Sequence, residues 1–450
     1  MSEKKDQQAL PAPWALAMAV LGMLSLGVLI GSVTDSYSRN AGFPTVLLEP
    51  SEPPPGETPS PEPIASEAGE PEAASAEPET VTATPSTAPA EAPLVEVPLP
   101  GAPEPEVPLV EEELPTGLPE VKHVFVIMLR EGGFEATFGK AAESSYLGKE
   151  LPEQGELLTN YFAVTKGALA NQIALLSGQG PTPETAANCP NYGDLAPGTE
   201  SSEGQAEGNG CLYPATTETL PGQLTEAGLT WKAYVQGIED GAAAGQPPSC
   251  RHPAPGSPDL NQAAIPGVDA YETWRNPFVY FHSIVDTPEC AEADVGLPRL
   301  SADLKLKAEK FPALAYIAPD EEQLEPLVAE IKESLAYKDG GMIAITSAQA
   351  PQEGEGADES GCCVDLDFPN LPDDGSEAPA TGPVRETGGG GQVGLLLLSP
   401  YVEPGTTNET YFNHFSLLVT IEELFELERI GYAAEPALTG FDESIFNAAG

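Results

Sequence analysis

The side chains best placed for chemistry in this 450-residue chain follow an apolar run at residues 121–129. Arg130 and Glu131 come directly after this run, and in α/β proteins ligands bind beyond the carboxyl ends of the strands. A guanidinium repels a divalent cation, but it pairs with a carboxylate such as Glu131 or donates two parallel hydrogen bonds to a phosphate. Lys166 supplies a second cation near the next polar turn. The two cations predict a pocket for an anionic group, and surface charge on loops is the alternative.

Three polar side chains are candidates for binding or proton transfer. Asn171 lies near the start of an apolar, helix-like stretch, where it either donates to a phosphoryl oxygen or makes an ordinary hydrogen bond at the helix start. His414 precedes another helical pattern, and it is either a group near an active site or a capping or buried histidine. Glu131 is a candidate general acid or base, with a solvated loop position as the alternative.

Several motifs of this chain resemble those of a bacterial phosphoesterase family, which includes phospholipases C and metal-dependent acid phosphatases. The apolar run that leads to Phe138-Gly139 resembles the opening motif of that family. Similar stretches follow in the same order along the chain, at residues 160–178, 229–234, 275–284, 338–350, 393–406 and 411–422. The resemblance covers nearly all of residues 119–450. It implies an alkaline-phosphatase-like fold, hydrolysis of phosphate esters and a divalent metal cofactor.

The positions that this resemblance assigns to chemistry carry other residues here. Where the family has a Glu-Asn pair of metal ligands, this chain has Arg130-Glu131. Ala168 stands at the position of the serine nucleophile, and a methyl group cannot attack phosphorus. Ala348 and Gln349 stand where two further carboxylates would bind the metal, and they supply no anionic oxygen. We therefore expect no metal cofactor and no intact catalytic set, with Glu131, Asn171 and His414 as its remnants and Arg130, Lys166 and Asn171 as ligand-binding candidates.

These substitutions lead to three functional hypotheses. The first is a pseudoenzyme that binds an anionic small molecule or a protein partner without turnover. The second is an active phosphoesterase whose metal site is rebuilt from Glu131, Asp320, Glu321 or His414. The third is a structural cell-surface protein, for which no pocket matters.

The elements that must position these residues alternate between strand-like and helix-like patterns. Apolar runs at residues 121–129, 341–346 and 393–399 are typical of strands buried on both faces. Leu327, Val328, Ile331 and Leu335 recur at helical spacing, and residues 415–427 form a second helical pattern with Glu422 and Glu423 expected to face outward. This alternation predicts an α/β fold with a mostly parallel central sheet and helices on both faces. Residues 350–392 are rich in Gly, Pro and acidic residues and predict a long irregular loop.

The amino-terminal part of the chain predicts export and anchoring. Residues 14–33 contain no charged side chain and match the length of a membrane-spanning helix. Lys4 and Lys5 precede them, so residues 1–13 should stay cytoplasmic and the rest of the chain extracytoplasmic. A cleaved signal peptide is the alternative. Residues 41–118 are rich in Pro, Glu, Ala, Ser and Thr, which predicts a disordered stalk ahead of a folded domain at 119–450.

All cysteines lie in the expected folded domain. An even number in an exported domain favours disulfides over a zinc site, because no ligand-like spacing of Cys and His occurs. Sequence order suggests Cys189 with Cys211 and Cys250 with Cys290, which leaves the adjacent Cys362 and Cys363, although sequence alone does not determine the pairing.

The net charge of the chain is −51, from 19 Lys plus Arg against 70 Asp plus Glu. Phosphates of nucleic acid would repel such a chain, and so would an anionic lipid surface. The charge therefore excludes nucleic acid as a partner. It favours solubility and self-repulsion, with an acidic interaction surface as the alternative.

Overall fold

The computed structural model describes residues 117–450, apart from 202, 355, 364–365, 372–383 and 449–450. The predicted cytoplasmic tail, membrane span and stalk lie outside these residues, except for 117 and 118. Within the described part of the chain, no helix is long and apolar enough to cross a membrane.

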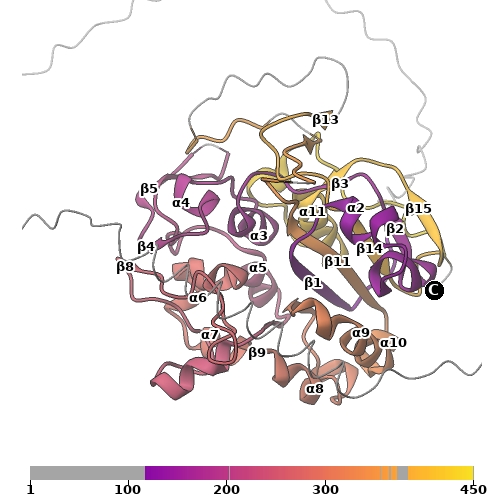
Figure 1. Cartoon of the computed structure of the whole chain (residues 1–450), viewed down its shortest axis with the longest axis horizontal. Helices are drawn as coiled ribbons and strands as arrows, with labels where there is room; N and C mark the ends of the chain where they lie inside the picture. Colours follow the sequence, from indigo (N-terminus) through magenta and orange to yellow (C-terminus); the bar gives the residue numbers. More distant parts are fainter. Residues whose placement is uncertain (1–116, 202, 355, 364–365, 372–383, 449–450) are drawn as a thin grey trace, which may run out of the picture. The chain divides into compact units, whose positions relative to one another are not determined.

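An eight-stranded sheet forms the centre of the described domain (Figure 1). Its strand order is β15-β2-β14-β11-β1-β10-β7-β9. All neighbouring strands are parallel except where β14 runs antiparallel to β11 and β2. The strands are β1 (His123–Glu131), β2 (Glu156–Leu158), β7 (Trp231–Val235), β9 (Asp294–Gly296), β10 (Leu314–Ala318), β11 (Gly341–Gln349), β14 (Leu395–Leu398) and β15 (Thr406–Asn408).

The central strands are buried on both faces, which is why they read as continuous apolar runs in the sequence. In β1, Val124, Val126 and Met128 belong to one hydrophobic core. Phe125, Ile127 and Leu129 point the other way, into a second core. The predicted α/β class with a mostly parallel sheet is confirmed. The strands predicted at 121–129 and 341–346 extend further, to Glu131 and Gln349, so both reach the polar edge of the sheet.

Helices cover both faces of the sheet. The first core is closed by α3 (Ala168–Ser177), α5 (Leu220–Glu226) and α11 (His414–Leu424). The second core is closed by α8 (Leu300–Asp303), α9 (Leu324–Glu333) and α10 (Leu335–Lys338). Other short helices are α2 (Phe134–Thr137), α4 (Pro183–Ala186), α6 (His282–Val285) and α7 (Pro288–Ala293).

Two details of the helical patterns differ from expectation. Leu335 is exposed because Ser334 caps a new helix, α10, and breaks the periodicity of α9. Glu422 was expected to face outward with Glu423, but it is fully buried. Its Oε1 accepts a hydrogen bond from the Ile430 backbone N–H at 3.1 Å, because the chain after α11 folds back over this face of the helix.

Short paired strands surround the central sheet. They are β3 (Tyr161–Phe162) with β16 (Phe412–Asn413), β4 (Asn191–Tyr192) with β8 (Ser257–Pro258), β5 (Ala196–Glu200) with β6 (Ala206–Asn209), and β12 (Gly361–Cys362) with β13 (Val384–Arg385). The last pair lies in the predicted irregular loop. The β3–β16 pair places the start of α11 beside the segment that leads into α3.

Disulfides join the cysteines, as expected for an exported domain. The pairs are Cys189–Cys211, Cys250–Cys290 and Cys362–Cys363. These are the pairs that sequence order suggested.

Candidate functional site

The candidate site lies where β1, β10 and β11 end at the same edge of the sheet. Arg130 and Glu131 close β1, and Ala348 and Gln349 close β11. Glu131 is directly opposite Gln349 in the parallel register. Asp320 follows β10 by two residues. Parallel pairing therefore brings together the positions at which the sequence suggested altered chemistry.

Arg130 is held between two carboxylates. Its Nη1 donates to Glu272, and its Nη2 donates to Asp320 Oδ1 at 3.0 Å. The Arg130 side chain is 37% exposed, whereas that of Glu272 is only 7% exposed. A pair with Glu131, which the sequence also allowed, does not form, because the guanidinium is directed to these two groups. Arg130 is therefore already paired in this structure.

A second arginine completes this ion-pair network. Arg275 Nη1 donates to the same Asp320 Oδ1 at 3.0 Å, and its Nη2 donates to the carbonyl of Pro319. Burial and the neighbouring Arg130 lower the pKa of Arg275 to about 10, so it remains charged at neutral pH. Two cations thus balance two carboxylates, and the network as a whole is neutral.

Glu131 and Gln349 form a separate hydrogen-bonded chain. Gln349 Nε2 donates to Glu131 Oε1 at 2.7 Å, and Gln349 Oε1 accepts from the Gly167 backbone N–H at 2.8 Å. The amide thereby ties the ends of β1 and β11 to the start of α3. A carboxylate at position 349 could not make both bonds, because it has no hydrogen to donate.

These residues do not fit a divalent metal. Ala348 offers no side-chain donor, and both polar atoms of Gln349 are already bonded. The carboxylates of Glu272 and Asp320 neutralise guanidinium groups. Glu131 remains as one anionic ligand beside a permanent cation, and hard divalent ions require several oxygen ligands.

The start of α3 is built without a nucleophile. Ala168 is fully buried. Gly167 adopts a positive φ of 100°, and a Cβ there would lie 2.5 Å from the Ala186 Cα. Glycine is therefore required at this turn, independently of any catalytic role.

The side-chain amide of Asn171 forms hydrogen bonds with the backbone of the loop ahead of α3. Its Oδ1 accepts from the backbone N–H groups of Val164 and Thr165, at 2.8 and 3.0 Å. Its Nδ2 donates to the carbonyls of Thr165 and Gly167, at 2.6 and 3.2 Å. This geometry favours the helix-start role over donation to a phosphoryl oxygen.

His414 is fully buried at the start of α11, next to Ala348. Its Nε2 lies 3.3 Å from the carbonyl of Ala348, and its Nδ1 lies 2.9 Å from the Tyr161 hydroxyl. Because a carbonyl only accepts, we assign the proton to Nε2, and the tyrosine donates to Nδ1. Burial lowers the pKa of His414 to about 4, so the ring is neutral. The arrangement favours the structural alternative.

Lys166, the second predicted ligand-binding cation, pairs with Glu359 at 2.7 Å. Both side chains are partly exposed, so the pair is weak by itself. Sequence reasoning missed Glu272 and Arg275 as partners for Arg130. Neither has a spacing that marks it, because the network forms only when the chain after β8 returns to the ends of β1 and β10.

A pocket of about 300 Å³ opens beside this network, on the α9 side of the sheet. We call it the edge pocket; its lining includes Arg130, Glu131, Thr137, Glu321 and Ser347. The Ser347 hydroxyl is buried and has no hydrogen-bond partner among the described residues. Because Glu131 and Glu321 flank the paired Arg130, the edge pocket does not favour an anion.

One other group of metal-type donors lies elsewhere in the described residues. Single donor atoms of Cys250, Cys290 and Asp294 lie within 4.8 Å of one another. The two cysteines form a disulfide, which leaves no thiolate to bind a metal.

The sequence matches a model described as the Phosphoesterase family over residues 140–428. The match spans more than half of the chain, so this protein belongs to the phosphoesterase family. No curated protein matches the chain in sequence.

Three solved structures are similar to this chain over roughly 70% of its length. A protein of the alkaline phosphatase superfamily from Vibrio parahaemolyticus has 10% identity and a TM-score of 0.39, over 70% of this chain and 69% of that chain. A phosphonate monoester hydrolase from Silicibacter pomeroyi has 12% identity and a TM-score of 0.35, over 73% and 77%. A sulfatase from Pseudoalteromonas sp. has 12% identity and a TM-score of 0.37, over 73% and 72%.

Proposed function

We propose that this protein is a pseudoenzyme of the phosphoesterase family, anchored to a membrane and displayed outside the cytoplasm. The observation that carries the proposal is the Arg130 guanidinium, which lies between Glu272 and Asp320 at the carboxyl end of β1. A permanent cation there neutralises the two carboxylates, as a metal ion would. Unlike a metal ion, it supplies neither an open coordination position nor a metal-bound nucleophile.

The remaining positions support the same conclusion. Ala168 has no group that can attack phosphorus, and Gln349 links two strands to α3. Two of the residues considered for a rebuilt metal site are already bonded to protein groups. His414 is fully buried between Ala348 and Tyr161, and Asp320 pairs with two arginines.

The pseudoenzyme would act by binding, and the two cations of its predicted anion site are already bonded to the protein's own carboxylates. Both cations predicted to receive an anion are paired, Arg130 in the network and Lys166 with Glu359. An anion would have to displace a carboxylate from one of them. Titration of the protein with inorganic phosphate, followed by calorimetry, is expected to give no saturable heat; a saturable site lost in Arg130→Ala would support the anionic ligand instead.

Catalysis is tested on the purified full chain. Its divalent metal content is measured by elemental mass spectrometry, and hydrolysis of a phosphate ester is assayed with added Zn²⁺, Mg²⁺, Mn²⁺ or Ca²⁺. We expect no stoichiometric metal and no turnover. Bound metal together with turnover that disappears in Glu131→Gln would overturn the proposal, because activity would then belong to this site and not to a contaminant.

Membrane anchoring rests on the uncharged run at residues 14–33. Membranes from cells that express the full chain are washed with alkaline carbonate, and a chain without residues 1–40 serves as the control. We expect the full chain to stay with the membrane and the shortened chain to be released. Release of both would contradict the anchor.

A further inference from the structure

A buried carboxyl group lies against one of the disulfides. A carboxylate oxygen of Asp294, in β9, and the sulfurs of Cys250 and Cys290 lie within 4.8 Å of one another. Asp294 is fully buried, and its Oδ2 accepts from Asn276 Nδ2 at 2.8 Å. Its Oδ1 has no hydrogen-bond partner among the described residues. An unpartnered carboxyl oxygen is costly to bury, which is expected where the group has a chemical role.

The two cysteines of this disulfide differ in their exposure to solvent. Cys250 is partly exposed, whereas Cys290 is only 1% exposed. An external thiol can therefore approach Cys250 but not Cys290.

We propose that Cys250–Cys290 is an exchangeable disulfide, opened by an external dithiol that attacks the partly exposed Cys250, and that Asp294 is the acid–base group of the exchange. The thiolate of the dithiol attacks Cys250 Sγ and forms a mixed disulfide. The bond to Cys290 Sγ breaks, and Cys290 leaves with the electron pair. The Asp294 carboxyl group transfers its proton to this thiolate.

The second thiol of the dithiol then completes the reaction. It attacks the other sulfur of the dithiol, the one that is bonded to Cys250 in the mixed disulfide. Cys250 then leaves as a thiolate and takes a proton from solvent. The dithiol is oxidised to a disulfide. The protein disulfide is reduced to two thiols, which takes up two electrons and two protons. Asp294 recovers its proton from solvent.

The surroundings of Asp294 suit this role. Burial raises the pKa of Asp294 to about 7, so the carboxyl group holds a proton through mildly acidic pH and can release it near neutrality. Tyr271 interacts electrostatically with Asp294. Burial raises the pKa of Tyr271 well above its usual value, so it remains neutral. Glu239 lies against Gly296, two residues after Asp294. Lys232 and Arg299 both pair with Asp303, so neither is an unpaired cation near the disulfide.

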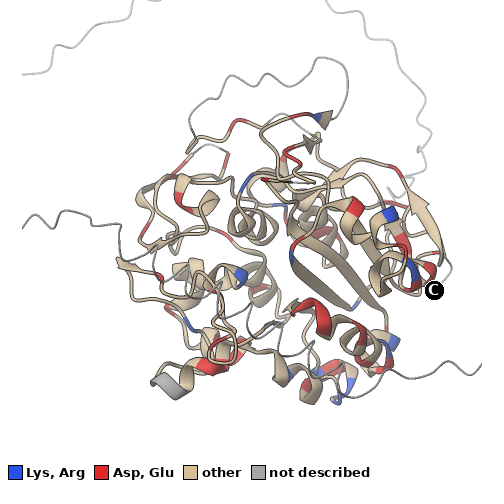
Figure 2. Cartoon of the chain, in the orientation of Figure 1, with Lys and Arg blue, Asp and Glu red and all other residues tan. Residues whose placement is uncertain are grey.

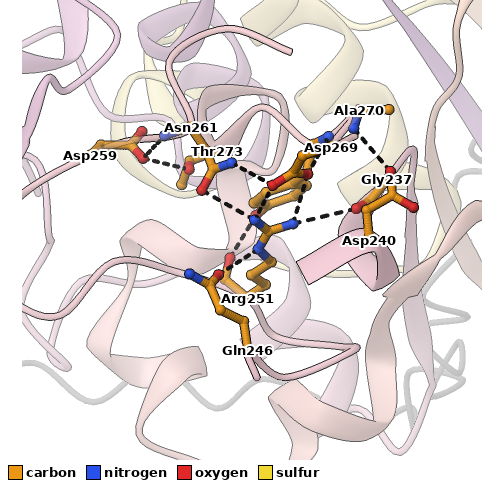
Figure 3. Close-up of polar contacts among 10 residues, drawn as sticks. Gly237, Asp240, Gln246, Arg251, Asp259, Asn261, Asp269, Ala270 and Thr273 are labelled. Carbon is orange, nitrogen blue, oxygen red and sulfur yellow. Dashed lines mark hydrogen bonds and ion pairs between the residues drawn. The ribbon is translucent and has the colours of Figure 1, made fainter. Parts of the chain in front are cut away.

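The chain around Cys250 is held independently of the disulfide, so exchange can be reversible. Arg251 is 3% exposed and donates to Asp269 Oδ1 at 3.0 Å, to Gln246 Oε1 at 2.7 Å and to Asn261 Oδ1 at 3.3 Å. Figure 3 shows this guanidinium at the centre of the loops that surround it. With the disulfide open, Arg251 still fixes its neighbour Cys250 close to Cys290.

The test measures how fast each disulfide of the oxidised full chain is reduced by dithiothreitol, by alkylation of the released thiols and peptide mass spectrometry. Cys250–Cys290 is expected to open faster than Cys189–Cys211, whose cysteines are both fully buried. Its rate, corrected for the thiolate fraction of dithiothreitol, should fall as pH rises through about 7, where Asp294 loses its proton. In Asp294→Asn the rate below pH 7 should drop at least about tenfold, and this pH dependence should vanish.

Asp259→Asn is the matched control, because Asp259 is also a buried carboxylate but bonds to Asn261, Gln262 and Thr273. Its exchange rate should equal that of the unmodified protein. The melting temperature of each variant separates loss of the acid from loosening of the fold, which would accelerate reduction of both disulfides. An unchanged or faster rate in Asp294→Asn, or a Cys250–Cys290 bond as resistant as Cys189–Cys211, would overturn the proposal.

Discussion

At the scale of single residues, guanidinium groups neutralise the carboxylates at the sheet edge. Glu272 and Asp320 need a positive partner, because Glu272 is almost fully buried. Arg130 and Arg275 supply that partner from two different segments. The fold around these carboxylates does not depend on a metal, because ion pairs neutralise them.

Arg130→Ala is therefore expected to destabilise the protein. The change leaves the buried Glu272 without its guanidinium, and truncation of one partner of a buried ion pair costs several kcal/mol. Because Arg130 itself is 37% exposed, we expect a smaller loss, about 2 kcal/mol in the free energy of unfolding by denaturant. Lys338→Ala, which breaks an exposed pair with Glu333, is the control and should cost less than about 0.5 kcal/mol. Equal losses in the two variants would contradict the role given to Arg130.

At the scale of elements, α11 contains a buried acid whose titration is coupled to folding. Glu422 is fully buried within the helix, and burial raises its pKa to about 8 from an ordinary value of 4.5. Between these two values the folded state keeps a proton that the unfolded state has lost. Stability from Glu422 is therefore lost as pH rises from about 4.5 to 8.

His414, at the start of the same helix, acts with the opposite sign. Burial lowers its pKa to about 4 from 6.5, so its contribution is lost as pH falls from 6.5 towards 4. Asp294 has the same sign as Glu422, but its titration is centred near pH 7. Of these three groups, Glu422 dominates between pH 7 and 8.

We expect the free energy of unfolding to decrease between pH 7 and 8, by at most about 1.4 kcal/mol per pH unit and proton. Glu422→Gln should flatten this slope, because the amide does not titrate. Urea titrations at several pH values measure it, with Glu423→Gln as the control at the neighbouring, less buried position. The same slope in both variants would show that another group titrates there.

At the scale of the whole molecule, acidic charge outweighs basic charge. Figure 2 shows Asp and Glu distributed over helices and loops of the described domain, with fewer Lys and Arg between them. The net charge of −51 makes self-repulsion part of the stability of the chain. Salt screens such repulsion, since the Debye length falls from about 30 Å at 0.01 M to about 8 Å at 0.15 M.

We therefore expect the melting temperature at pH 7.5 to rise when NaCl is increased from 0.01 to 0.15 M. A gain of about 1 kcal/mol corresponds to roughly 1–2 °C for a domain of this size. At pH 5, closer to the isoelectric point of about 4.1, the same addition should have a smaller effect. A fall in melting temperature with salt at pH 7.5 would mean that attractive ion pairs outweigh the repulsion.

Sequence alone was enough for the α/β class and for the strands that carry the site. Continuous apolar runs have only one stable place, in strands covered on both faces, so β1, β11 and β14 could be located within a few residues. Ala168, Ala348 and Gln349 were also informative without a structure, because their side chains lack the required chemistry wherever they lie.

Only the tertiary structure decided what Arg130, Glu422 and Asp294 do. Arg130 bonds to Glu272, which is 142 residues away in the sequence, and no local pattern announces such a partner. Glu422 reads as an outward-facing acid in its helix, yet the segment after α11 covers it. Asp294 is an ordinary acid until two cysteines are brought to it. Charge and hydrophobicity act locally along the chain, whereas burial and pairing depend on which distant segments meet.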